Sequence, residues 1–150
     1  MLGNIITQKN GFTLIELLIT ISIITILSII AFPSFSNLIN ERKLASSFKE
    51  LSMTLTNARS EAVTLKQNVD VQLNSSDSNT LNILNWNPIS PYIYLESGSV
   101  LKVTFAPNGG VQQFNETSMI FVLCNSNLKK SKSLQLTRMG SLNILADGVC

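Results

Sequence analysis

The stretch GFTLIELLITISIITILSIIAFP, residues 11–33, decides how this chain can fold. Between Phe12 and Phe32 it holds one ionisable side chain, Glu16, among apolar and hydroxyl-bearing residues. As an α-helix this segment would be roughly 32 Å long, which matches the hydrocarbon core of a bilayer at about 30 Å. The sequence therefore predicts a transmembrane helix over residues 12–33.

Glu16 is the unusual residue of this segment. A carboxylate inside a membrane costs about 2 to 3 kcal/mol on insertion scales, so its presence suggests a function. The ordinary alternative is that Glu16, close to the membrane edge, extends its carboxylate to the lipid headgroups. The segment alone does not separate these two interpretations.

The leader MLGNIITQKNG, residues 1–11, precedes the apolar run and ends on Gly11. A secretory signal peptide has the opposite order, because its cleavage site follows the apolar segment. The order found here, with GFTLIE at the junction and Pro33 after the run, resembles type IV pilins and type II secretion pseudopilins. That resemblance implies that a prepilin peptidase cuts after Gly11 and methylates the new N-terminus at Phe12.

The resemblance also implies a location and a set of partners. The chain would cross the inner membrane once, with residues 34–150 as one periplasmic domain, and would join a pilus or pseudopilus after assembly. Its partners would be the inner-membrane assembly platform and other minor and major pilins or pseudopilins. Glu16 would dock subunits, because a carboxylate and a neighbour's α-amino group are each costly in a low dielectric and offset that cost when paired.

Composition argues against an enzyme. The chain has no histidine, which removes the commonest general base and metal ligand. Its formal net charge of +2 gives no general case for nucleic acid. Asp70, Asp77 and Asp147 are scattered and form no calcium-loop pattern, so we expect neither a metal nor a cofactor.

Two cysteines, Cys124 and Cys150, are too few for a structural zinc site. In a domain outside the cytoplasm a disulfide is the natural expectation, with two unpaired buried thiols as the alternative. Closing the loop between them would stabilise the fold by roughly 3 kcal/mol in the chain-entropy model.

Residues 34–66 contain neither glycine nor proline and predict an amphipathic helix. Its apolar positions recur at spacings of three and four: Leu44, Phe48, Leu51, Leu55, Ala58, Ala62 and Leu65. The other face carries charges that we expect in solvent: Arg42, Lys43, Lys49, Glu50, Arg59 and Glu61. The run is short for a coiled coil, so we expect this helix to lie against a sheet.

Beyond Gln67 the apolar period changes to alternation, which is typical of strands. Short strands are predicted over residues 69–73, 81–86, 92–95, 100–105, 119–124, 133–137 and 141–145. Turns are expected at Asn108-Gly109-Gly110, at residues 138–141 and at Asp147-Gly148. The predicted fold is α+β, with one long N-terminal helix, half membrane and half amphipathic, packed on an antiparallel sheet or small β-sandwich formed by residues 67–150.

Three stretches after the membrane segment resemble the GspH/FimT/FimU group of minor pilins and pseudopilins. They are LTNARSEAVTLKQNVDVQL (55–73), VTFAPNGGV (103–111) and LTRMGSLNI (136–144), the last paired with a cysteine strand. The chain departs from many relatives in its last hairpin, where it has Arg138, Met139, Gly140 and Ser141 in place of Gly-Arg.

Some FimT-like minor pilins bind DNA for natural transformation. The resemblance therefore raises DNA as a partner, although it is the less favoured one here. Four cations fall within ten residues: Lys129, Lys130, Lys132 and Arg138. Such side chains can contact phosphates, but no aromatic residues interleave with them for base stacking. The favoured function is a structural subunit of a type IV pilus, or the H-type pseudopilin of type II secretion. A DNA-binding pilin is the alternative, and an anchored envelope enzyme is remote.

Overall fold

The computed structural model describes residues 12–116 and 119–150, and leaves the side chains of residues 30–34 undescribed. It divides the chain into two compact units, Met1–Asn37 and Leu38–Cys150. The predicted leader, residues 1–11, lies outside the described residues.

One α-helix, α1, runs from Leu14 to Leu65. Its assignment is continuous through Pro33, so the two helices predicted from sequence form one secondary-structure element. The helix ends where Lys66 takes a left-handed backbone conformation, with φ of 55°. Left-handed residues commonly terminate helices, because they turn the chain away from the helix axis.

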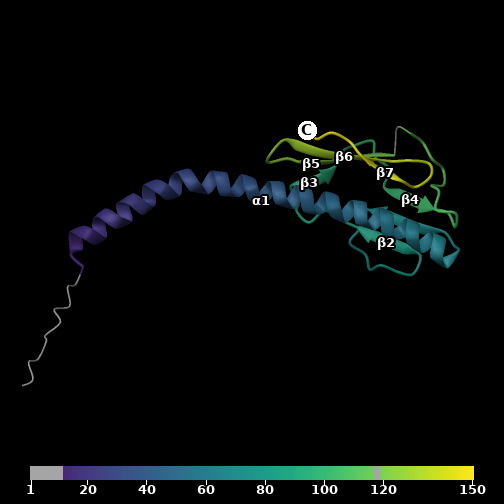
Figure 1. Cartoon of the computed structure of the whole chain (residues 1–150), viewed down its shortest axis with the longest axis horizontal. Coiled ribbons are helices and arrows are strands. Elements are labelled where there is room, and N and C mark those ends of the chain that lie inside the picture. Colours follow the sequence, from purple (N-terminus) through teal and green to yellow (C-terminus); the bar gives the residue numbers. More distant parts are fainter. Residues whose placement is uncertain (1–11, 117–118) are drawn as a thin grey trace, which may run out of the picture. The chain divides into compact units, whose positions relative to one another are not determined.

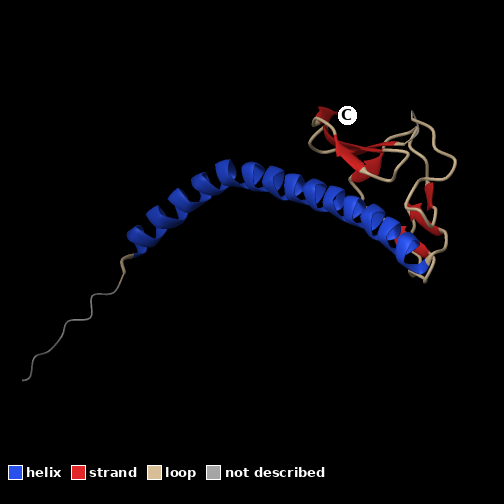
Figure 2. Ribbon diagram, turned by 45° about the vertical axis from the view of Figure 1, so that its right-hand side comes forward, coloured by secondary structure: helices blue, strands red, loops and turns tan. Residues whose placement is uncertain are grey.

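In the described part of the chain, eight strands follow α1 (Figure 1). They are β1 Val69–Leu73, β2 Ile83–Trp86, β3 Ile93–Leu95, β4 Lys102–Phe105, β5 Ile120–Asn125, β6 Lys130–Leu136, β7 Leu142–Ile144 and β8 Gly148–Val149. They form a three-stranded sheet in the order β2-β1-β4 and a five-stranded sheet in the order β3-β5-β6-β7, with β8 also paired to β6. Figure 2 shows these strands in red beside the second half of the blue helix.

The predicted α+β fold is confirmed, with local differences in its strands. β1 and β2 pair in parallel, Val71 opposite Leu84, whereas the other strand pairs are antiparallel. The second difference is β8, which occupies Gly148–Val149 where only a turn was expected. This short strand contains no apolar alternation that a sequence pattern could reveal.

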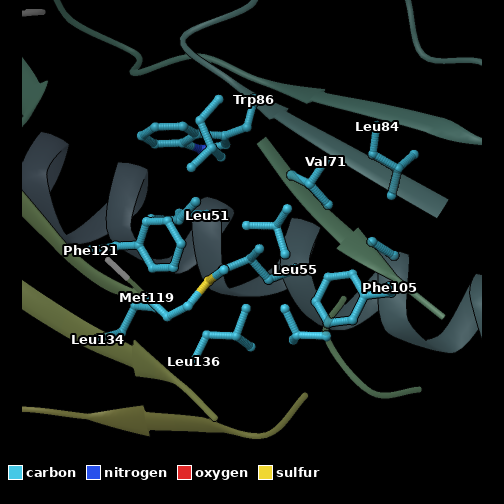
Figure 3. Close-up of a cluster of buried hydrophobic side chains, with 14 of the residues drawn as sticks. Leu51, Leu55, Val71, Leu84, Trp86, Phe105, Met119, Phe121, Leu134 and Leu136 are labelled. Carbon is cyan, nitrogen blue, oxygen red and sulfur yellow. The ribbon is translucent and has the colours of Figure 1, made fainter. Parts of the chain in front are cut away.

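The hydrophobic core lies between the helix and both sheets. Figure 3 shows Leu51 and Leu55 of α1 between the side chains of the two sheets. Val71 and Trp86 of one sheet lie on one side of them, and Phe121 of the other sheet lies near them. Six of the seven apolar helix positions predicted from sequence are buried, whereas Leu65, the last residue of α1, is 39% exposed.

Candidate functional site

The start of α1 holds Glu16 in a reciprocal hydrogen-bonded arrangement with Thr13. Oε2 of Glu16 accepts hydrogen bonds from the Thr13 backbone N–H at 2.9 Å and from its hydroxyl at 2.8 Å. The Glu16 N–H donates to the Thr13 hydroxyl at 3.3 Å, which completes a capping box. Thr-x-x-Glu ahead of an apolar run is the sequence signature of this cap. Gly11 lies outside the described residues, while Phe12 is described and 87% exposed.

The helix segment after Glu16 presents apolar side chains in every direction. Every Leu and Ile side chain described between Leu14 and Ile29 is exposed, from 47% to 76%. The hydroxyls among them are bonded internally, since Thr20, Ser22, Thr25 and Ser28 each donate to a carbonyl three or four residues earlier. Such back-bonding satisfies a hydroxyl without water or a partner. A helix that is apolar on all sides is typical of a membrane span or of the core of a large assembly.

In the described part of the chain, no helix combines the length and the apolar composition needed to cross a membrane.

The two cysteines are joined in a disulfide, Cys124–Cys150, with their Cα atoms 5.8 Å apart. Cys124 lies on β5 and is buried, and Cys150 follows β8. The Cys150 N–H also donates to the Lys129 carbonyl at 3.2 Å. The disulfide therefore fastens the C-terminus to the five-stranded sheet.

The four cations considered for DNA binding do not form one cluster. Lys129 and Lys130 lie at the turn between β5 and β6, whereas Arg138 lies beyond the opposite end of β6. At about 3.4 Å per residue, β6 separates these ends by roughly 20 Å. Residues 130–132, which precede the strand predicted over 133–137, are the first part of β6 because they pair with β5 and β8.

Most of these cations already have partners within the chain. Lys130 pairs with Glu41, and Lys132 pairs with Asp147 at 2.7 Å. Arg138 lies over the Phe114 ring, with its guanidinium carbon 5.4 Å from the centroid. The two carboxylate pairs reduce the positive charge that Lys130 and Lys132 offer to a phosphate backbone, whereas Arg138 keeps its charge over the ring.

The three aspartates considered as metal ligands do not share a contact: each lies beside different residues. Asp147 pairs with Lys132, Asp77 accepts a hydrogen bond from Ser75 at 3.2 Å, and Asp70 lies on β1. No group of three or more His, Cys, Asp or Glu residues that could hold a metal occurs among the described residues.

Asp70 is held by two neighbours on β4. Lys102 lies 2.8 Å from its carboxylate, and the Thr104 hydroxyl donates to it at 2.6 Å. Partial burial opposes ionisation of Asp70, but these hydrogen bonds and the Lys102 charge outweigh it and lower the pKa of the carboxyl below its usual value. The arrangement is an ion pair on the outer face of the sheet and has no catalytic geometry.

One charged residue of the helix has a role that periodicity did not predict. Arg59, expected in solvent, is half-buried and donates from Nε to the Gly109 carbonyl at 3.2 Å. Gly140 packs against both Gly109 and Arg59. A Cβ at position 140 would lie 2.2 Å from the Gly109 oxygen and 3.0 Å from the Arg59 side chain. We call these three residues the Arg59 junction. It joins α1 to two turns that lie far from it in sequence.

Two comparisons bear on identity. Residues 6–32 match the model of the prokaryotic N-terminal methylation motif. The fold is similar to the crystal structure of the type IV minor pilin FimU of Pseudomonas aeruginosa, with a TM-score of 0.55 and 18% identity over 71% of this chain and 90% of FimU. The chain therefore carries this methylation motif ahead of a domain with the fold of FimU. A second crystal form of FimU gives a TM-score of 0.51 and 19% identity over 69% of this chain and 93% of FimU.

No curated protein sequence matches the chain significantly. The likeness to FimU, at this level of identity, shows the fold alone, and the family match is limited to residues 6–32.

Proposed function

We propose that the chain is a minor pilin, a structural subunit of a type IV pilus. The observation that carries this proposal is the methylation motif over residues 6–32, placed before a domain with the FimU fold. The H-type pseudopilin of type II secretion is the alternative, since both machines use the same leader and peptidase.

In this proposal a prepilin peptidase cuts after Gly11 and methylates Phe12. Residues 12–33 then anchor the subunit in the inner membrane, with residues 34–150 in the periplasm, until the assembly platform extracts it. The all-round apolar surface of the segment suits both states, because lipid and neighbouring pilin helices cover it equally well. Its internally bonded hydroxyls add no unsatisfied polar group to either environment.

Glu16 is the docking residue of this proposal. Cleavage creates a positively charged α-amino group at Phe12, and a neighbouring subunit's Glu16 can pair with it inside the apolar bundle. The pair offsets the desolvation of both charges and fixes how far one subunit is shifted along the next. Within its own chain Glu16 caps α1 through Thr13, so one carboxylate would serve the isolated subunit and the assembly in turn.

The test is mass spectrometry of the N-terminal peptide from pili sheared off producing cells. We expect a peptide that begins with N-methylated Phe12 and depends on the prepilin peptidase. Two outcomes would refute the proposal: a chain that keeps residues 1–11, or absence of the protein from the pilus fraction. Recovery of the processed chain with secretion pseudopilins would select the alternative machine.

A further inference from the structure

A pocket of about 430 Å³ lies on the unit Leu38–Cys150, between residue 74 after β1 and the segment 87–94 that leads from β2 into β3. Its polar lining residues are Asn74, Asn87, Ser90 and Tyr94. Its apolar lining residues are Pro88, Ile89, Pro91 and Ile93. The volume is within the range of small-molecule sites in proteins, about 300 to 1,000 Å³.

The lining of this pocket carries no carboxylate, ammonium or guanidinium group, so it offers no ion pair to a charged ligand. Arg42 and Lys43 line a different hollow, which shares Ile89 with the pocket. The asparagine amides and the Ser and Tyr hydroxyls of the pocket can each donate and accept hydrogen bonds. This chemistry suits a neutral ligand that carries several hydroxyl groups.

Three polar side chains of the pocket have hydrogen-bonding capacity that the described residues leave unused. Ser90 is only 5% exposed, yet its hydroxyl bonds to no residue in the described part of the chain. The Asn74 amide and the Tyr94 hydroxyl also have no partner there. A buried hydroxyl without a partner is costly, so a ligand that bonds to Ser90 would gain affinity from that bond.

The segment that carries these groups is held in place from two sides. The Ile89 N–H donates to the buried hydroxyl of Ser47, on α1, at 3.2 Å. Nδ2 of Asn87 donates to Oγ of Ser76 at 3.0 Å. The two prolines of the segment restrict its backbone further. A pocket fixed in this way is preorganised, because little conformational entropy is lost when a ligand binds.

We propose that this pocket binds a neutral sugar unit of a glycan. The C–H face of a sugar ring is apolar and packs on an aromatic ring, here that of Tyr94, which is 46% exposed. The hydroxyls at the rim of the sugar would bond to Ser90 and to the amides of Asn74 and Asn87. This binding stands apart from the pilin function, because it needs neither leader cleavage nor assembly.

The test is an NMR titration of the full chain, purified in a detergent without a sugar headgroup, with lactose and diacetylchitobiose as probes. We expect at least one of these disaccharides to bind with a dissociation constant of about 1 mM. Tyr94→Ala should weaken binding at least about tenfold through lost stacking, and Ser90→Ala about fivefold through a lost hydrogen bond. Tyr94→Phe keeps the ring and should bind within about threefold of the wild type.

The matched control is Tyr92→Ala. Tyr92 is 51% exposed but does not line the pocket, so its loss should leave the affinity unchanged. An unchanged unfolding midpoint confirms that each variant is folded. Absence of binding to both disaccharides, or equal losses in Tyr92→Ala and Tyr94→Ala, would overturn the proposal. Preferential binding of the acidic sialyllactose would also overturn it and would indicate Arg42 and Lys43 instead.

Two immobilised polymers distinguish the source of the sugar. Retention of the chain on purified cell-wall sacculi would indicate a glycan of the bacterial envelope. Retention on lactose-bearing resin would indicate a glycan on another cell. In either case Tyr94→Ala should pass through unretained, and retention of the wild type on neither polymer would overturn the assignment to a glycan.

Discussion

The two halves of α1 use the same residue types in opposite ways. Between Leu14 and Ile29 every described Leu and Ile side chain is at least 47% exposed, whereas Leu51 and Leu55 are at most 1% exposed. The second half is amphipathic and stabilises the fold of its own chain. The described part of the first half exposes apolar side chains on all sides, so its apolar surface is available to lipid or to other subunits.

This comparison predicts that the same substitution has different effects in the two halves. Leu55→Ala leaves a cavity in the core and should lower the free energy of unfolding by about 3 to 4 kcal/mol. Leu27→Ala removes the same atoms from a residue that is 60% exposed. It should change the free energy of unfolding by less than about 0.5 kcal/mol. Denaturant unfolding of the full chain in detergent measures both. Equal losses would contradict the division of the helix.

The next effect concerns the C-terminus of the folded unit. Replacing both Cys124 and Cys150 by serine removes the disulfide and should destabilise that unit by about 3 kcal/mol, since the unfolded chain regains the freedom of the closed loop. Unfolding of the wild type with and without a reductant provides the same comparison without substitution. A variant as stable as the oxidised wild type would show that β8 is held by its other contacts.

The Arg59 junction gives a third test. Gly140 has φ of +74° and no room for a Cβ, so Gly140→Ala should cost about 2 to 3 kcal/mol through strain and displacement of the Gly109 carbonyl. Gly110 lies near the same turns, but a Cβ there would meet its nearest neighbour at 3.2 Å. We expect Gly110→Ala to cost less than about 1 kcal/mol by the same unfolding measurement. Similar costs at both positions would argue against the tight contact.

The smallest expected effect depends on pH. Because the pKa of Asp70 is lowered in the folded protein, its charged form adds stability above its unfolded pKa of about 3.9. That stability is lost as the pH falls through the lower folded value. The exposed Lys102 limits the contribution to less than about 1 kcal/mol.

Asp70→Asn should therefore reduce stability slightly at pH 6, and the difference from the wild type should diminish as the pH approaches 3. Asp77→Asn, on the exposed loop after β1, serves as the control. A difference between wild type and Asp70→Asn that is constant from pH 6 to pH 3 would contradict the ion-pair account.

Local patterns in the sequence predicted the fold better than they predicted the contacts at the candidate sites. The spacing of Leu44 to Ala62 identified the buried face of the helix, because a helical period depends only on neighbouring residues. Strand alternation located most strands for the same reason. It could not indicate that β1 and β2 are parallel, since alternation is identical in both kinds of pairing.

Long-range contacts explain what the sequence did not predict. The partner of Arg59 is the backbone of Gly109, fifty residues away, and no periodicity encodes it. Closeness in sequence was also misleading at Lys130 and Arg138, because an extended strand places them at opposite ends. The cap between Thr13 and Glu16 could have been predicted from the sequence, because its signature spans only four residues.

The central claim is that Glu16 serves assembly in addition to capping its own helix. The most direct measurement compares Glu16→Ala with Thr13→Ala, because each removes one side of the cap but only the first removes the carboxylate. The readouts are cleavage after Gly11 and the amount of processed chain in the pilus fraction. We predict normal cleavage in both variants, with at least a tenfold loss of incorporation for Glu16→Ala and near-normal incorporation for Thr13→Ala. Equal incorporation of the two variants would contradict the docking role and leave Glu16 as a helix cap alone.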